Sequence, residues 1–153
     1  MIKRFIEIEN TIKFKTYNQD EWELLLKINR NDAIKLLLEM HLLEYSLAQI
    51  VSVKSKTTSE IIAFSLSENP NEKISTIEKI NNKLKISLSP NNLQYLISFL
   101  LRYYRDSHTP TNHIHLDISE KSPLGKSGDV IIETEDESNP LSGEELEKLL
   151  KNV

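Results

Sequence analysis

Two histidines and an aspartate alternate with apolar residues in the segment HIHLDI, and they are the side chains best suited to chemistry. A β-strand places every second side chain on one face, so His113, His115 and Asp117 would share a face while the intervening residues point to the core. Imidazole and carboxylate groups are common ligands of zinc and similar divalent ions. One interpretation of this strand is therefore a small metal-dependent hydrolase centred on these three residues.

The rest of a metal site is not evident in the sequence. A complete site needs further ligands and hydrogen bonds that orient them, and the chain has no cysteine to supply a thiolate. The other histidines, His41 and His108, do not stand in a ligand pattern such as H-E-x-x-H. We therefore expect no metal, no cofactor and no catalytic residue, and we treat the histidine strand as a candidate contact with a partner.

The triplet Gly125-Lys126-Ser127 resembles part of a phosphate-binding loop. Such a loop needs another glycine five positions before the first residue of this triplet, between a strand and a helix. Position 120 is glutamate, and the residues after the triplet have the pattern of a strand. The segment is better explained as a glycine-containing turn that leads into that strand.

Acidic residues are concentrated near the C-terminus. Residues 117–153 contain 10 Asp and Glu but 4 Lys and Arg, whereas residues 1–116 contain 13 acidic and 15 basic residues. This distribution would repel nucleic acid, whose phosphates are bound by Lys and Arg, and would attract a basic protein. We expect a protein partner with a basic surface, and neither a nucleic-acid nor a membrane partner.

The candidate contacts with such a partner are the acidic side chains of this region together with the histidine strand. Complementary charge accelerates association and favours the correct partner. An acidic run can also be an ordinary solvated surface, and the sequence leaves both readings open. The candidate residues are Glu133, Glu135, Asp136, Glu137, Glu144, Glu145, His113, His115 and Asp117.

The chain has the size and composition of one globular domain over residues 1–153. With 153 residues, 39% hydrophobic and 27% charged, it can bury a single core. Without cysteine it forms no disulfides. The opening sequence MIKRFIEIEN lacks the apolar run of a secretory signal, and no segment approaches the roughly 20 apolar residues of a membrane span. We expect a soluble cytoplasmic protein.

Hydrophobic spacing predicts the elements that position these residues. The alternation around residues 6–14 predicts a hairpin that turns at Glu9-Asn10, and Asp20 could cap a helix bearing Trp22, Leu25, Leu26 and Ile28. A second helix, capped by Asn31 or Asp32, is apolar on nearly every side and is expected at the centre of the molecule. Its end is ambiguous, because residues 47–53 also fit a strand.

The second half of the chain has clearer patterns. Ser89-Pro90 predicts the start of a helix whose buried stripe includes Leu93, Leu96, Ile97, Leu100, Leu101 and Tyr104. Ser142 and Glu145 have the spacing of a capping box for a last helix with an apolar face of Leu146, Leu149 and Leu150. Strands are expected within residues 62–66, 74–80, 84–88, 113–118 and 129–135. We therefore predict an α+β fold in which a mostly antiparallel sheet packs against three to four helices as a single pair of layers.

The order of segments from residue 80 to residue 135 is distinctive. The strand KLKISLS is followed by the helix SPNNLQYLISFLLRYYRD, then by NHIHLDI and SPLGKSGDVIIETE. This succession resembles the small immunity proteins of bacterial polymorphic toxin systems, with an H-x-H-L strand, a glycine and serine turn and an apolar strand. Lys126 separates the glycine from the serine, which departs from that pattern. Residues 1–70 would then be N-terminal strands and helices of the same domain.

The resemblance implies an antitoxin that binds and neutralises a cognate toxin by blocking its active site. If that toxin is a nuclease, its active site must be basic to hold phosphates, and an acidic surface would fit it. The resemblance brings no catalytic residues with it. The alternatives are a protein-binding adaptor without a toxin partner and the metal-dependent hydrolase described above.

Overall fold

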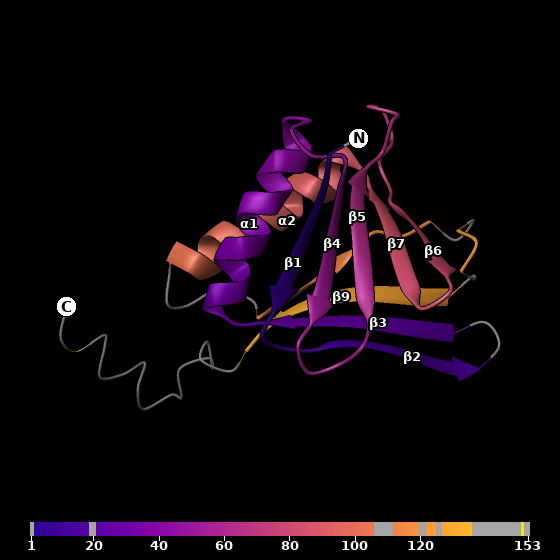
Figure 1. The fold of residues 1–153 in the computed structure, drawn as a ribbon, viewed down its shortest axis with the longest axis horizontal. Helices are drawn as coiled ribbons and strands as arrows, with labels where there is room; N and C mark the ends of the chain where they lie inside the picture. Colours follow the sequence, from indigo (N-terminus) through magenta and orange to yellow (C-terminus); the bar gives the residue numbers. More distant parts are fainter. Residues whose placement is uncertain are drawn as a thin grey trace.

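Nine strands in two sheets and two helices form the part of the chain that the computed structural model describes, which is residues 2–18, 21–105, 112–119, 122–124, 127–135 and 151 (Figure 1). The protein is α+β, but the expected mostly antiparallel sheet against three to four helices is wrong. The elements are β1 (Lys3–Ile8), β2 (Ile12–Asn18), β3 (Glu21–Ile28), α1 (Arg30–Glu44), β4 (Ile50–Ser55), β5 (Ile61–Leu66), β6 (Thr76–Ile80), β7 (Lys83–Leu88), α2 (Pro90–Arg105), β8 (His113–Leu116) and β9 (Ser127–Thr134).

Both sheets are mixed. The strand order is β1-β4-β5-β7-β6 in the first, which we call sheet A, and β2-β3-β9-β8 in the second, sheet B. The pairs β1–β4, β5–β7 and β3–β9 are parallel, and the other four pairs are antiparallel. Parallel pairs join segments far apart in sequence, because a crossover connection must separate their strands. The antiparallel arrangement expected for residues 62–88 is therefore wrong for β5 and β7.

The core lies between three layers. Figure 1 shows α1 and α2 on one side of sheet A, with the strands of sheet B crossing below them. The inward side chains of both sheets and the buried faces of both helices belong to one apolar cluster. Its largest fully buried members include Phe64, Met40, Leu24 and Tyr103. The described parts of the chain thus share a single apolar core.

The expected helix over residues 22–28 is strand β3. Trp22, Leu24, Leu26 and Ile28 are buried and alternate with more exposed residues, which is the two-residue period of a strand. Three consecutive leucines satisfied both patterns in the sequence. The strand prevails because β3 has a partner on each side, β2 and β9. Asp20, the expected cap, lies outside the described residues.

Strands β1 and β2 form where expected but do not make a hairpin with each other, because β1 belongs to sheet A and β2 to sheet B. Asp32 in the first turn of α1 holds the connection between them. Its carboxylate accepts hydrogen bonds from the backbone N–H groups of Glu9 at 2.7 Å and Asn10 at 3.3 Å. It also completes a capping box with Asn29, the true N-cap of α1.

The helices differ from expectation in extent and burial. Helix α1 ends at Glu44, and the ambiguous residues after it include strand β4. The helix is not central, because Leu38 and Tyr45 on its outer side are exposed. In α2 the buried stripe includes Tyr103, whereas Leu101 and Tyr104 are exposed. Among the described residues, neither helix is long and apolar enough to cross a membrane.

Candidate functional site

The outward side of β8 and β9 gathers acidic groups and two imidazoles. In the antiparallel register His113 is opposite Glu133 and His115 is opposite Ile131, and opposite residues project from the same face. Asp117 and Asp129 continue these strands at two-residue spacing, so they face the same way. We call His113, His115, Asp117, Asp129 and Glu133 the acidic face. The sequence prediction of a shared face for residues 113, 115 and 117 agrees with the alternating burial of β8.

The acidic face is distinct in charge from the rest of sheet B. Residues 112–119 and 127–135, which carry β8 and β9, include four acidic residues and no Lys or Arg. On the neighbouring strand β3, Glu23 pairs with Asp129 and Lys27 pairs with Glu133. Two further lysines, Lys13 and Lys15, lie on β2 at the opposite edge of the sheet. Negative charge is therefore concentrated on the β8–β9 side of the sheet.

Hydrogen bonds within the core hold the end of β8 in place. The buried Asn92 of α2 donates from its amide nitrogen to Ser75 Oγ at 2.5 Å and to the backbone oxygen of Asp117 at 2.9 Å. The backbone N–H of Ser75 donates to the same Asp117 oxygen at 2.8 Å. These bonds connect sheet B to α2 and to the segment before β6. The end of β8 is therefore fixed relative to α2 and to the segment before β6.

The two imidazoles lie together on the outward side of β8. Their ring centroids are 5.1 Å apart, and the rings meet edge to face. His115 Nδ1 is 2.7 Å from Asp129 Oδ2, and His113 Nδ1 is 2.9 Å from Asn112 Oδ1. Within the described ranges, no three His, Asp or Glu side chains are placed to hold a metal ion. The structure brings His113, His115 and Asp117 onto one face without converging them on one point.

Asp129 is the residue of this site that the sequence analysis missed. It fixes the orientation of His115, from a position 14 residues further along the chain. The sequence did contain a signal for Asp129. If HIHLD pairs antiparallel with DVIIE, the aspartate that ends the first segment lies opposite the aspartate that begins the second. Glu135 follows β9, and its backbone N–H donates to the oxygen of Ile28 at 2.8 Å. Asp136, Glu137, Glu144 and Glu145 lie outside the described residues.

Comparison with known protein families and with curated sequences gives no relative to guide the assignment. No model of a known protein family matches this chain, and no curated protein sequence matches it. The function must therefore be argued from the site.

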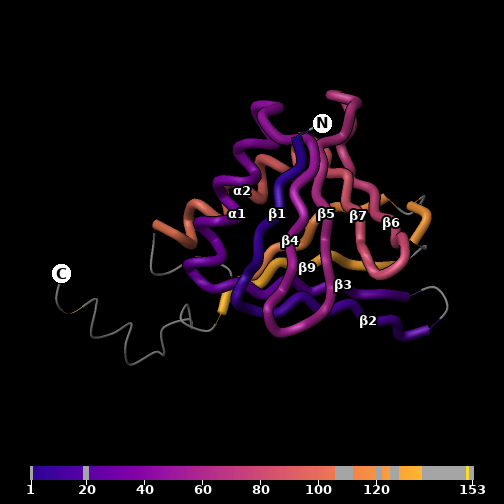
Figure 2. The backbone as a smooth tube through the Cα atoms, viewed as in Figure 1, coloured from indigo at the N-terminus to yellow at the C-terminus, as the bar shows by residue number. Residues whose placement is uncertain are grey.

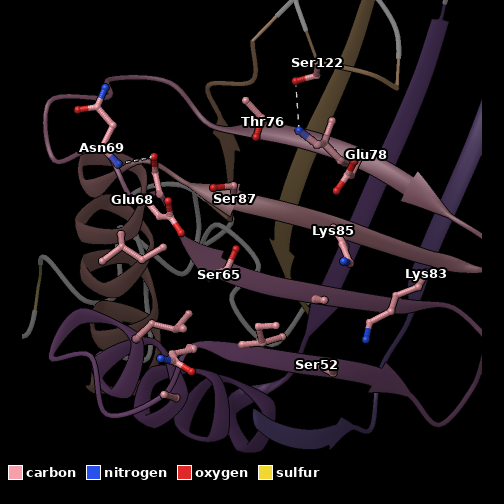
Figure 3. A pocket seen from close by; sticks show the side chains of 18 of the residues that line it. Ser52, Ser65, Glu68, Asn69, Thr76, Glu78, Lys83, Lys85, Ser87 and Ser122 are labelled. Atoms are coloured by element: carbon pink, nitrogen blue, oxygen red, sulfur yellow. Dashed lines mark hydrogen bonds between the residues drawn. The ribbon is translucent and has the colours of Figure 1, made fainter. Parts of the chain in front are cut away.

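A second feature, absent from the sequence analysis, is a hollow of about 1210 Å³ over the side of sheet A that faces away from the helices (Figure 3). Its floor consists of small residues, because Ser52, Ala63, Ser65, Thr76 and Ser87 project there from four strands. The charges around it are mixed, with Lys3, Lys83 and Lys85 against Glu68 and Glu78. The sequence signal was one serine on the outward face of each of β4, β5 and β7. This balance of charges favours no particular ligand.

A partly buried carboxylate lies near one end of the core. Glu60 precedes β5, and its Oε2 atom has no hydrogen-bond partner among the described residues. Burial raises the pKa of Glu60 above its ordinary value of 4.5, while a hydrogen bond with the backbone of Phe14 and the charge of Lys79 act in the opposite direction. Lys79 Nζ also lies 4.9 Å from the centroid of the Phe14 ring. The folded protein therefore favours the charged form of Glu60 less than water does.

Replacing Glu60 with glutamine should stabilise the protein at neutral pH. Because its folded-state pKa is raised, Glu60 favours folding most below pH 4.5, and this contribution is lost as the pH rises through the folded-state pKa. The side chain is partly solvated, so we expect a gain below about 1 kcal/mol at pH 7 and no gain at pH 3.5. Urea unfolding of both proteins at the two pH values measures it. A variant less stable than the parent at pH 7 would refute this assignment.

Proposed function

We propose that this chain is an immunity protein that binds a basic toxin through the acidic face and blocks its active site. The observation that carries the proposal is that residues 112–119 and 127–135, which bear β8 and β9, contain Asp and Glu but no Lys or Arg. The same surface displays the two imidazoles of β8. Acidic side chains on a rigid sheet attract a basic surface and hold it in one orientation. The resemblance of residues 80–135 to toxin immunity proteins supports the same reading.

The acidic residues and the histidines have different parts in this proposal. Asp117 and Glu133 supply negative charge that steers the partner toward the face. His113 and His115 supply flat, partly apolar rings that can pack in an interface, and His115 is held by Asp129. The acidic residues that follow Glu135 would extend the charged surface. A nuclease is the toxin class that fits best, because its active site must attract phosphate groups. Such a protein would act in the cytoplasm of the cell that makes the toxin.

The test is a pull-down with the product of the neighbouring gene. We expect the two proteins to co-purify as a stable complex and co-expression to protect cells from that product. Absence of a complex together with absence of protection would overturn the proposal. A stable complex with a harmless product would instead support an adaptor, the alternative left open by the sequence.

A further inference from the structure

Helix α1 exposes an apolar stripe on its outer side. Ile34 is 38% exposed, Leu38 is 56% exposed and Tyr45 is 67% exposed, while Leu42 between them is half-buried. Their spacings of three and four residues place them on one face of the helix, opposite the core-facing side. A surface helix ordinarily carries polar residues on that face. We call Ile34, Leu38, Leu42 and Tyr45 the α1 stripe.

The described part of strand β9 ends beside this helix. Strand β9 pairs with β3 as far as Thr134, which is opposite Ile28, and Glu135 continues the pairing through its hydrogen bond to Ile28. The next residue, Asn29, is the N-cap of α1. Figure 2 shows the end of β9 next to the start of α1. The residues after 135 therefore begin within a few residues of the α1 stripe.

The sequence that follows has the length and pattern to cover the stripe. Residues 136–141 can span roughly 20 Å when extended, whereas Ile34 lies only about 8 Å along the helix axis from Asn29. Beyond them, Ser142 and Glu145 predict a helix start, and Leu146, Leu149 and Leu150 fall on one side of it. The predicted helix needs an apolar surface to bury these leucines.

The charges around the stripe complement those of this segment. Arg30 and Lys35 are exposed on the first turns of α1, and Arg102 is exposed near the end of α2. Arg30 Nη2 donates to the backbone oxygen of Tyr104, which brings the end of α2 next to the start of α1. The segment has Glu144, Glu145 and Glu147 in its first two helical turns. Its acidic start would thus meet a basic border.

We propose that residues 142–150 form an amphipathic helix that docks on the α1 stripe, with its leucines against Ile34 and Leu38. The contact buries apolar surface on both partners, which is the main source of stability in such an interface. Glu145 and Glu147 flank the leucine side of that helix, where they can meet the basic border. The inference concerns this chain alone and does not depend on a toxin partner.

Engineered cysteines test the docking directly, because the natural chain contains none. The test variants of the full chain combine Leu146→Cys with either Ile34→Cys or Leu38→Cys. The matched controls replace Leu146→Cys with Lys148→Cys, on the opposite side of the predicted helix. In at least one test pair we expect an intramolecular disulfide to form about tenfold faster than in its control, because docking raises the local concentration of the two thiols.

Two outcomes would overturn the docking. Equal rates of disulfide formation in test and control pairs would show that the segment has no preferred face on α1. Disulfide-linked dimers, seen by non-reducing electrophoresis, would show that a second copy covers the stripe. Hydrogen exchange of the unmodified chain provides a measurement free of mutations. We expect the amides of residues 146–150 to exchange at least tenfold more slowly than in an unstructured peptide, and exchange at the peptide rate would contradict the proposal.

Discussion

A single methyl group at position 128 should destabilise the protein by roughly 1–3 kcal/mol or more. The indole of Trp22 lies across Gly128 on the neighbouring strand, where the two residues are paired. The Cβ of an alanine at 128 would overlap the atoms of that ring. Trp22 is buried in the core, so the ring would have to leave its place or force β3 and β9 apart. Gly128→Ala therefore disturbs the sheet that carries the acidic face.

Chemical denaturation and tryptophan fluorescence measure this effect together, because Trp22 is the single tryptophan of the chain. We expect a lower midpoint and a red-shifted emission in Gly128→Ala. The control is Asp129→Ala on the same strand, whose side chain is exposed and whose loss should cost less than about 1 kcal/mol. In a Trp22→Leu background, adding Gly128→Ala should cost much less, since the clashing ring is gone. An unchanged midpoint for Gly128→Ala would show that the ring lies elsewhere.

If the proposed partner binds through the acidic face, reversing two charges there should slow its association about 10- to 100-fold at low ionic strength. The variant is Asp117→Lys with Glu133→Lys, which leaves the pair of His115 and Asp129 intact. Both positions face outward from sheet B, so the fold should be retained. The effect should shrink markedly at high salt, because mobile ions screen interactions between exposed charges. Stopped-flow or surface-based kinetics with the neighbouring gene's product gives the rates.

A matched control separates the acidic face from the overall charge of the protein. Glu7→Lys with Glu68→Lys makes the same change in net charge at exposed positions on sheet A and the loop after β5. We expect this control to associate at close to the parent rate. If both variants slow association equally, net charge and not this surface governs the encounter. If neither does, the acidic face has no part in binding.

Local patterns predicted most strands but not their partners. The alternation in β7 and β8 is unambiguous, because polar and apolar residues strictly alternate and one face of each strand is buried. In β3 the run of leucines also fits a helix, and its strand form depends on β9, which lies about a hundred residues further along the chain. Pairing at that distance leaves no trace in a short window.

The first two strands illustrate the same limit. Their alternation and the Glu9-Asn10 break are typical of a hairpin, but Asp32 binds both N–H groups of that break. A buried carboxylate 22 residues further on thus directs the chain from one sheet into the other. Helix α1 was expected at the centre of the molecule because its own sequence has apolar residues on nearly every side. Its outer residues remain exposed, which is the basis for the docking proposed above.

The candidate site was only partly accessible to sequence reasoning. Period-two spacing correctly placed His113, His115 and Asp117 on one face of a strand, but it could not show whether they converge. Asp129 and Glu133 join that face only through the β8–β9 register. The hollow of sheet A arises from small residues on strands that are not all adjacent in sequence. Both features depend on tertiary pairing.

The salt dependence of the association rate between the unmodified chain and the neighbouring gene's product tests the central claim most directly. If the acidic face steers a basic partner, the rate constant should fall at least tenfold between about 20 mM and about 500 mM salt, while dissociation changes less. A rate constant that stays constant over that range would contradict binding through the acidic face.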